Sequence, residues 1–259
     1  DMFNDFAFRE DVKLAGVNSI NWGRVLAQVV YYFSSAVSLG APHRDISFTV
    51  PTGNFGDIFA GYIAQQMGLP IKDLVVATNR NDILHRTLET GSYTKEGVEP
   101  TISPSMDIQV SSNFERALFY AYDQDGAAVA GQMEDLKSGG FQISQGAYQM
   151  LKDTFKSGRA SEEETSATIK TYLAQHGELL CPHTAVGTHV AEDHLGTTPM
   201  ITLATAHPAK FPDAVKAASG VMAPLPPRMA DLYDRPERVT RCANDLSALQ
   251  AVIKERITS

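Results

Sequence analysis

Apolar and polar positions follow two periods along this chain, and the periods predict where its helices and strands lie. Between residues 19 and 38, apolar side chains recur every three or four positions, from Val25 to Ala36, which predicts a long helix. Further on, β-rich runs and helical patterns follow one another, with strands at 46–50 and 74–78 and helices at 58–67 and 82–89. A strand, a turn, a helix and a second strand within about forty residues predict a parallel βαβ layer.

The second half of the chain is predicted to begin with helices and then to return to strand and helix. Residues 113–176 are expected to be mostly helical, with Ser161 and Glu164 forming a capping box at the start of one helix. The remaining segments are expected to be a strand at 200–205, a helix at 212–218, a proline-rich connector at 223–227 and a last helix at 244–255.

These elements predict the α/β class, with a mainly parallel sheet that is flanked by helices. We expect residues 1–220 to form one α/β lobe, which includes the helical middle section. Residues 221–259 are expected to contribute the connector and the C-terminal helix, packed on the same lobe.

Charge and composition narrow the possible functions. The chain carries 30 acidic and 22 basic residues, net −8, which argues against a nucleic-acid partner but leaves room for a local basic pocket. Its apolar runs fall far short of the ~20 residues that span a bilayer. Cys181 and Cys242 are too few for a disulfide framework, so a cytoplasmic location is expected. The spacing of His183, His189 and His194 does not match a zinc site, and no metal is expected.

The clearest candidate for chemistry is the turn at residues 51–57, between the first strand and its helix. Gly53 and Gly56 permit positive φ and close backbone approach, so that consecutive N–H groups can converge on an anion. The following helix would add the positive end of its dipole. The spacing matches neither a Walker loop nor a dinucleotide fingerprint. A phosphate site and an ordinary tight turn with a capped helix are both compatible with this pattern.

Two further clusters carry groups that could bind ligands. Ser19, Asn21 and Arg24 lie at the start of the long helix, where the guanidinium could clamp a phosphate or a carboxylate. A capped helix with a surface arginine accounts for the same residues. Thr205 lies at the carboxyl end of the last predicted strand, and open α/β sheets bind ligands beyond the carboxyl ends of their strands. Lys210, with His207 nearby, belongs either to that site or to an ordinary loop.

Together, these clusters resemble motifs of the threonine synthases, in the order in which that family carries them. The matching segments are 18–24, 50–57, 182–187 and 205–211, and they point to the longer bacterial and fungal branch. The family belongs to the tryptophan-synthase-like, fold-type-II group of pyridoxal-phosphate enzymes. The resemblance therefore implies pyridoxal 5'-phosphate as cofactor, O-phospho-L-homoserine as a small-molecule substrate, and L-threonine and phosphate as products.

The resemblance also implies roles for single residues. Backbone amides of Gly53, Asn54, Phe55 and Gly56 would hold the cofactor phosphate, and the Thr205 hydroxyl would hydrogen-bond the pyridine nitrogen. A neutral hydroxyl at that nitrogen leaves the ring unprotonated. His183 and Thr184 would shape the wall near the cofactor without taking part in a step. The substrate phosphate would be bound by four side chains, those of Ser19, Asn21, Arg24 and Lys210.

One departure from the family bears on activity. Threonine synthases attach the cofactor to a lysine in their N-terminal part, near a Gly-Asp-Thr-Gly loop, and neither element is found here. We therefore expect this chain to correspond to the C-terminal portion of such an enzyme and to be inactive alone. The missing N-terminal part of the same protein is then an expected partner. A surface that normally faces that part would be exposed, as an apolar patch that promotes self-association.

Two alternatives remain at this point. The first is another fold-type-II lyase, such as a serine or threonine dehydratase, although its hydroxyl leaving group needs no phosphate clamp of the kind that Arg24 suggests. The second is a non-catalytic module that binds a phosphorylated ligand.

Overall fold

The computed structural model describes residues 2–258, and these divide into two units. Ser19–Pro224 form the larger unit, which contains every residue of the candidate sites. Residues up to Asn18 and from Leu225 onward form the smaller one.

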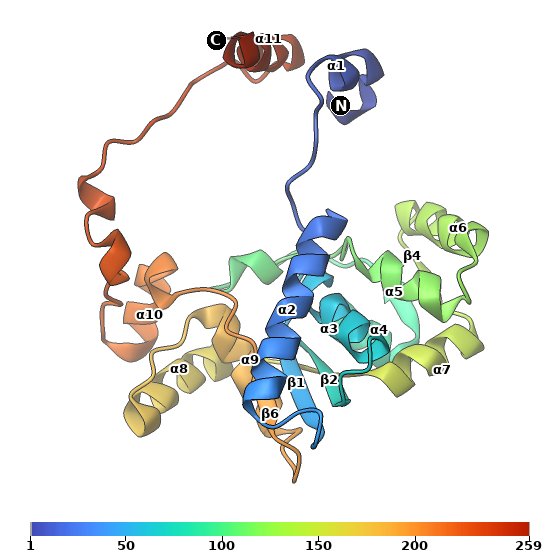
Figure 1. Ribbon diagram of the computed structural model, residues 1–259, viewed down its shortest axis with the longest axis vertical. Coiled ribbons are helices and arrows are strands. Elements are labelled where there is room, and N and C mark those ends of the chain that lie inside the picture. The colour runs from blue at the N-terminus through green and yellow to red at the C-terminus, as the bar shows by residue number, and fades with distance from the viewer. Residues whose placement is uncertain (1, 259) are drawn as a thin grey trace. The chain divides into compact units, whose positions relative to one another are not determined.

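The larger unit is built on a four-stranded sheet in which all strand pairs are parallel. The spatial order is β5-β2-β1-β6, so β1 and β2 lie at the centre (Figure 1). The expected class, α/β with a parallel sheet flanked by helices, is confirmed. The strand bounds are β1 Ile46–Pro51, β2 Ile71–Thr78, β5 Phe155–Arg159 and β6 Met200–Thr202.

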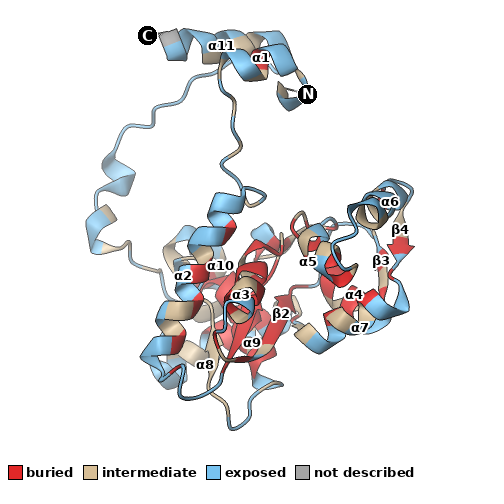
Figure 2. Cartoon of the chain, turned by 45° about the vertical axis from the view of Figure 1, so that its right-hand side comes forward, coloured by how far each residue is buried: buried red, intermediate tan, exposed pale blue. Residues whose placement is uncertain are grey.

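Helices cover both faces of this sheet. Every residue of β1 is buried, as expected for a strand that is packed on two sides. Along β2, Leu74 and Val76 join the core under α2 (Trp22–Ser38) and α3 (Gly56–Gln66), whereas Val75 and Ala77 pack against α9 (Pro182–Glu192). The buried strands and the buried side of α9 form the centre of the unit in Figure 2.

The remaining elements of this unit surround the sheet. A two-stranded antiparallel ribbon joins β3 (Ser92–Thr94) to β4 (Gly140–Gln142). Short 3₁₀ turns are found at η2 (Pro104–Met106) and η3 (Pro208–Lys210). The other helices are α4 Ile83–Thr90, α5 Phe114–Ala121, α6 Gly126–Lys137, α7 Gln145–Thr154, α8 Glu162–His176 and α10 Pro212–Ser219.

The middle section is mostly helical, as expected, through α5, α6, α7 and α8. Two strands, β4 and β5, interrupt it, and β5 belongs to the main sheet, where it pairs with β2. The predicted capping box is confirmed, because the Ser161 side chain accepts from the Glu164 amide while the Glu164 carboxylate accepts from the Ser161 amide. The last strand ends at Thr202, earlier than expected, so Thr205 lies in the loop beyond it.

In the smaller unit, helices α1 (Phe6–Asp11) and α11 (Leu246–Thr258) are joined by polar contacts. The Gln250 amide donates to Asp5, and Lys254 forms an ion pair with Asp11. Short 3₁₀ turns lie at Met2–Asn4, Pro227–Met229 and Leu232–Asp234. The expected packing of residues 221–259 on the lobe stays a prediction. Across residues 2–258, no helix combines the length and apolarity that a membrane crossing requires.

Candidate functional site

The turn between β1 and α3 is held from behind by its carbonyl groups. The Ser111 hydroxyl donates to the carbonyl of Gly53 at 2.7 Å, and both amides of Asn113, backbone and side chain, donate to the carbonyl of Asn54 at 3.0 and 2.9 Å. In a trans peptide the carbonyl and the following N–H point in opposite directions. The N–H groups of Asn54 and Phe55 therefore face away from Ser111 and Asn113.

These outward amides have no partner within residues 2–258. The backbone N–H groups of Asn54, Phe55 and Gly56 donate no hydrogen bond there, although buried or half-buried amides are almost always paired. Phe55 adopts the left-handed conformation (φ 61°) just before α3, and its ring is fixed between Phe114 and Phe155 at 5.2 Å. We call the three amides of Asn54, Phe55 and Gly56 the amide cradle, and the expected role of the Gly53 amide stays a prediction. The N-terminus of α3 adds positive dipole to it.

The two glycines of the turn are required by close packing rather than by backbone conformation. A Cβ on Gly53 would lie 2.6 Å from the Ser105 carbonyl oxygen, and one on Gly56 would lie 3.2 Å from the Asn113 side-chain nitrogen. Neither glycine has a positive φ. The expected freedom of φ is therefore not used, whereas close backbone approach is found at Gly53, against the Ser105 carbonyl.

The amide cradle opens into a cavity of about 690 Å³, which several predicted site residues share. Its wall contains the whole turn, Ser19 and Arg24 at the start of α2, and Thr205 beyond β6. The predicted residues that the structure brings together are Ser19, Arg24, Gly53, Asn54, Phe55, Gly56 and Thr205.

Asn21 and Lys210 do not line this cavity. The Asn21 side chain accepts from the Gly23 amide at 2.8 Å and caps α2, the helix that carries Arg24. Lys210 is exposed at the end of η3, with its ammonium 5.6 Å from the centre of the Phe211 ring. In the same turn, His207 accepts from the Ala209 amide.

The cavity also has walls that sequence reasoning missed. Gln28 and Tyr31 lie one and two turns beyond Arg24 on the same side of α2, so the helical period could have found them. Ser105 comes from η2, about fifty residues from the turn, where no local pattern indicates proximity. Leu203 and Ala204 lead from β6 to Thr205.

An acidic side chain lies next to the amide cradle. Asp57 follows Gly56 in the first turn of α3 and lines the cavity. Burial raises the pKa of its carboxyl to about 6, although a long hydrogen bond from the Tyr32 hydroxyl opposes the shift. The same hydroxyl donates to the Asp57 backbone carbonyl at 2.8 Å. At neutral pH, Asp57 is thus a half-buried carboxylate close to its point of titration.

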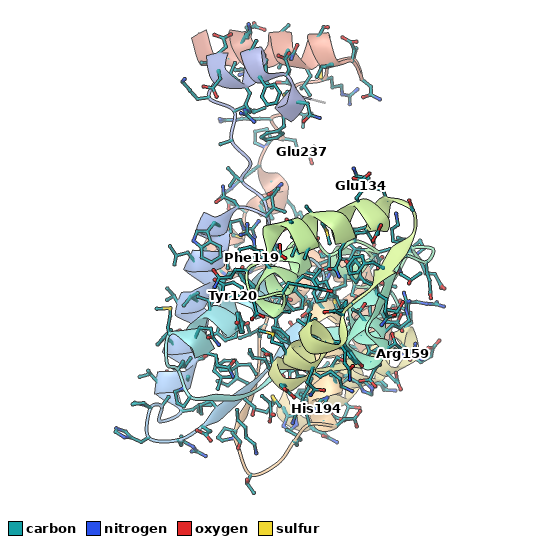
Figure 3. All side chains as sticks on the ribbon, turned by 90° about the vertical axis from the view of Figure 1, so that its right-hand side faces the viewer. Phe119, Tyr120, Glu134, Arg159, His194 and Glu237 are labelled. Atoms are coloured by element: carbon teal, nitrogen blue, oxygen red, sulfur yellow. The ribbon has the colours of Figure 1, made fainter. Side chains whose placement is uncertain are left out.

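The three histidines considered as zinc ligands lie in different surroundings. His183 is buried in α9, His189 faces Glu164 at 3.7 Å, and His194 follows the end of α9 (Figure 3). Across the described range, no three His, Cys, Asp or Glu side chains gather closely enough to hold a metal ion.

A second, more apolar cavity of about 580 Å³ lies between the start of α2 and helices α5 and α6. Phe119 and Tyr120 project from α5 into this region (Figure 3), where Trp22 and Phe59 complete an aromatic wall. None of the predicted site residues lines it.

Comparison with known proteins shows which proteins this chain is similar to. A family model described as "Threonine synthase, C-terminal" matches residues 184–253. Threonine synthase of Pseudomonas aeruginosa is 49% identical over 98% of this chain and 55% of that protein. The crystal structure of PLP-bound threonine synthase from Brucella melitensis matches with 56% identity and a TM-score of 0.96, over 100% of this chain and 56% of that one.

The yeast threonine synthase structure also matches all of this chain, with 38% identity and a TM-score of 0.84. The chain spans about half the length of each of these relatives. By sequence and by fold, it is related over nearly its whole length to the C-terminal part of the threonine synthases.

Proposed function

We propose that the cavity beside the amide cradle binds pyridoxal 5'-phosphate. The cofactor phosphate would accept hydrogen bonds from the amides of Asn54, Phe55 and Gly56, and the hydroxyl of Thr205 would serve the pyridine nitrogen. The observation that carries the proposal is the set of three unpaired amides that open into a cavity shared with Thr205. The PLP-bound state of the related Brucella protein supports the same assignment.

The residues present fit such a group. An anion would supply the acceptors that the amide cradle lacks, and the N-terminus of α3 would stabilise its charge. When bound, pyridoxal phosphate acts as an electron sink for carbanions next to the substrate amino group. This chain would orient the ring and bind the phosphate, while the hydroxyl of Thr205 would keep the ring nitrogen unprotonated.

We further propose that the chain serves, as the C-terminal portion of a threonine synthase, in converting O-phospho-L-homoserine and water into L-threonine and phosphate. Arg24 and Ser19 would bind the substrate phosphate and hold it as it leaves, which their shared position in the cavity wall with the amide cradle supports. Direct contacts of Asn21 and Lys210 with that phosphate remain predictions. The lysine that carries the cofactor would come from an N-terminal part of the enzyme, in the cytoplasm.

Titration of the chain with pyridoxal phosphate and with inorganic phosphate tests the cofactor site. We expect both to bind at one site, in competition, as measured by ³¹P NMR and calorimetry. Gly53→Ala should weaken both at least tenfold, because its methyl group must displace the Ser105 carbonyl. Gly131→Ala, in α6, is the matched control. A Cβ at Gly131 meets nothing within 4 Å, so binding should not change.

Turnover separates the candidate functions. We expect the chain alone, with cofactor added, to release no phosphate from O-phospho-L-homoserine. Release of phosphate together with a borohydride-reducible lysine in this chain would contradict the proposal that the lysine comes from elsewhere. Deamination of threonine would favour a dehydratase, and phosphate binding without any binding of pyridoxal phosphate would favour a simple phosphate-binding module.

A further inference from the structure

His183 connects α9 to the turn that packs against the amide cradle. It is the second residue of α9 and is only 4% exposed. Its Nε2 atom accepts a hydrogen bond from the backbone N–H of Ser105, in η2, at 3.1 Å. Its ring packs against Phe211, with the centroids 4.6 Å apart. His183, which lies outside the cavity, thus holds the main chain of Ser105, a residue of the cavity wall.

Ser105 transmits that contact to the turn at Gly53. Its carbonyl oxygen lies 2.6 Å from the point that a Gly53 Cβ would occupy, so the two backbones are in direct contact. On the other side of Gly53, the hydroxyl of Ser111 holds the carbonyl. The first peptide of the amide cradle is therefore confined between the η2 turn and Ser111.

The hydrogen bond also fixes the state of the imidazole. Because Nε2 accepts, the ring proton must be on Nδ1, and this N–H is buried without a partner among residues 2–258. Burial, with the nearby charge of Lys210, lowers the pKa of His183 to about 4, so the ring stays neutral and keeps its acceptor. The protein thus retains a histidine in a position where one of its polar atoms is unsatisfied.

The C-terminal end of the η2 turn, at Asp107, is anchored separately. The carboxylate of Asp107 accepts from the side chains of Asn79, Asn81 and Thr101 and from the Thr101 amide, at 2.6 to 3.0 Å. This network fixes Asp107, the residue that directly follows the η2 turn. The orientation of the Ser105 peptide itself depends on the bond to His183.

We propose that His183 is a positioning residue that holds the Ser105 turn against Gly53 and thereby sets the geometry of the amide cradle for its anion. This role rests on the proposed binding of a phosphate group there. His183 itself does not line the cavity, so it acts through Ser105 rather than on the ligand.

Two substitutions separate this role from simple packing. His183→Gln keeps an acceptor near the position of Nε2, whereas His183→Leu keeps an apolar side chain and removes the acceptor. We expect the leucine variant to lose at least tenfold in affinity for inorganic phosphate and for pyridoxal phosphate, and the glutamine variant to lose less than threefold. Hydrogen exchange of the Ser105 amide should be at least tenfold faster in the leucine variant. His189→Leu, on the same helix and outside the cavity, is the control and should change neither quantity.

A measurement on the unmodified chain covers the case in which the leucine variant does not fold. ¹⁵N NMR of the His183 ring should show the proton on Nδ1 and an acceptor at Nε2, and the opposite tautomer would overturn the proposal. Equal phosphate affinity in the leucine variant and the unmodified chain would overturn it too, with the cofactor site intact. If the unmodified chain binds neither ligand, the proposed function fails first, and the role of His183 with it.

Discussion

Asp57 and His183 are titratable groups whose contributions to the stability of the fold change with pH in opposite directions. Asp57 has its pKa raised from 3.8 to about 6, so the folded state retains a proton that the unfolded state has released. Its contribution to stability is present at low pH and is lost as the pH rises towards 6. His183 has its pKa lowered from 6.5 to about 4, so its contribution is present above 6.5 and is lost as the pH falls.

In the unmodified chain these two effects on the slope of unfolding free energy against pH largely cancel. Substituting one residue at a time should therefore reveal each of them. Each shift corresponds to about 3 kcal/mol of unfolding free energy across the interval. Between about pH 4 and pH 6.5, we expect the unfolding free energy of Asp57→Asn to rise more steeply with pH than that of the unmodified chain. That of His183→Gln should instead fall relative to it. Urea unfolding at several pH values measures both. Parallel curves for all three proteins would show that neither group has the environment described here.

Sequence reasoning reaches the parts of the candidate site for which the evidence is local. The turn at Gly53 and Gly56 follows a strand and precedes a helix, an order that suits an anion site and an ordinary capped turn alike. Ser105 could not be found in this way, because its contact with Gly53 depends on the path of a loop between β3 and α5. The hydrogen bond from the Ser105 amide to His183 could not be predicted for the same reason, although the sequence does point to His183 as a residue near the cofactor.

At the level of elements, the sequence does not predict the strand β5. β5 contains Lys156, Ser157 and Gly158, which have little strand preference, and it directly follows α7. Its conformation comes from parallel pairing with β2 and from packing against α9, where Gly158 allows Val190 to approach closely. The strands β1 and β2 carry apolar β-rich sequences and were predicted from them, although β2 begins at Ile71, earlier than the expected residue 74.

The packing of α9 on the strand ends gives a test at this scale. A Cβ on Gly187 would lie 2.9 Å from Pro51, the last residue of β1, and 3.0 Å from Thr202, the last of β6. Gly187→Ala should push α9 away from these ends and lower the unfolding free energy by about 1–3 kcal/mol. Phosphate affinity should fall with it, because the site follows both strands. Gly146→Ala, in an open part of α7, should not destabilise the chain. Equal unfolding curves for the two variants would argue against close packing at Gly187.

On the scale of the molecule, one apolar surface of the larger unit faces outward. Leu26, Val30 and Val37 lie on one side of α2 and are 55 to 60% exposed. Figure 1 shows α2 at the outside of this unit, over α3. A row of large apolar side chains on a helix surface is typical of a face that is normally covered.

We therefore expect the isolated chain to associate with itself as its concentration rises. Sedimentation velocity over a range of concentrations would show this as a growing fraction of larger species. Leu26→Lys together with Val30→Lys should return it to a monomer, because two charges would have to be buried. Val98→Lys, an equally exposed apolar position elsewhere, is the control and should leave association unchanged. A chain that stays monomeric at every concentration would contradict self-association through the exposed apolar side of α2.

The carbonyls of Gly53 and Asn54 are already held by Ser111 and Asn113, and this has a kinetic consequence. Because the turn is already held in place, binding of a ligand requires no prior folding of a loop. Association with a phosphate should then proceed in a single phase whose observed rate rises linearly with ligand concentration and does not level off. Affinity differences between phosphorylated compounds would then arise mainly from how slowly each one leaves.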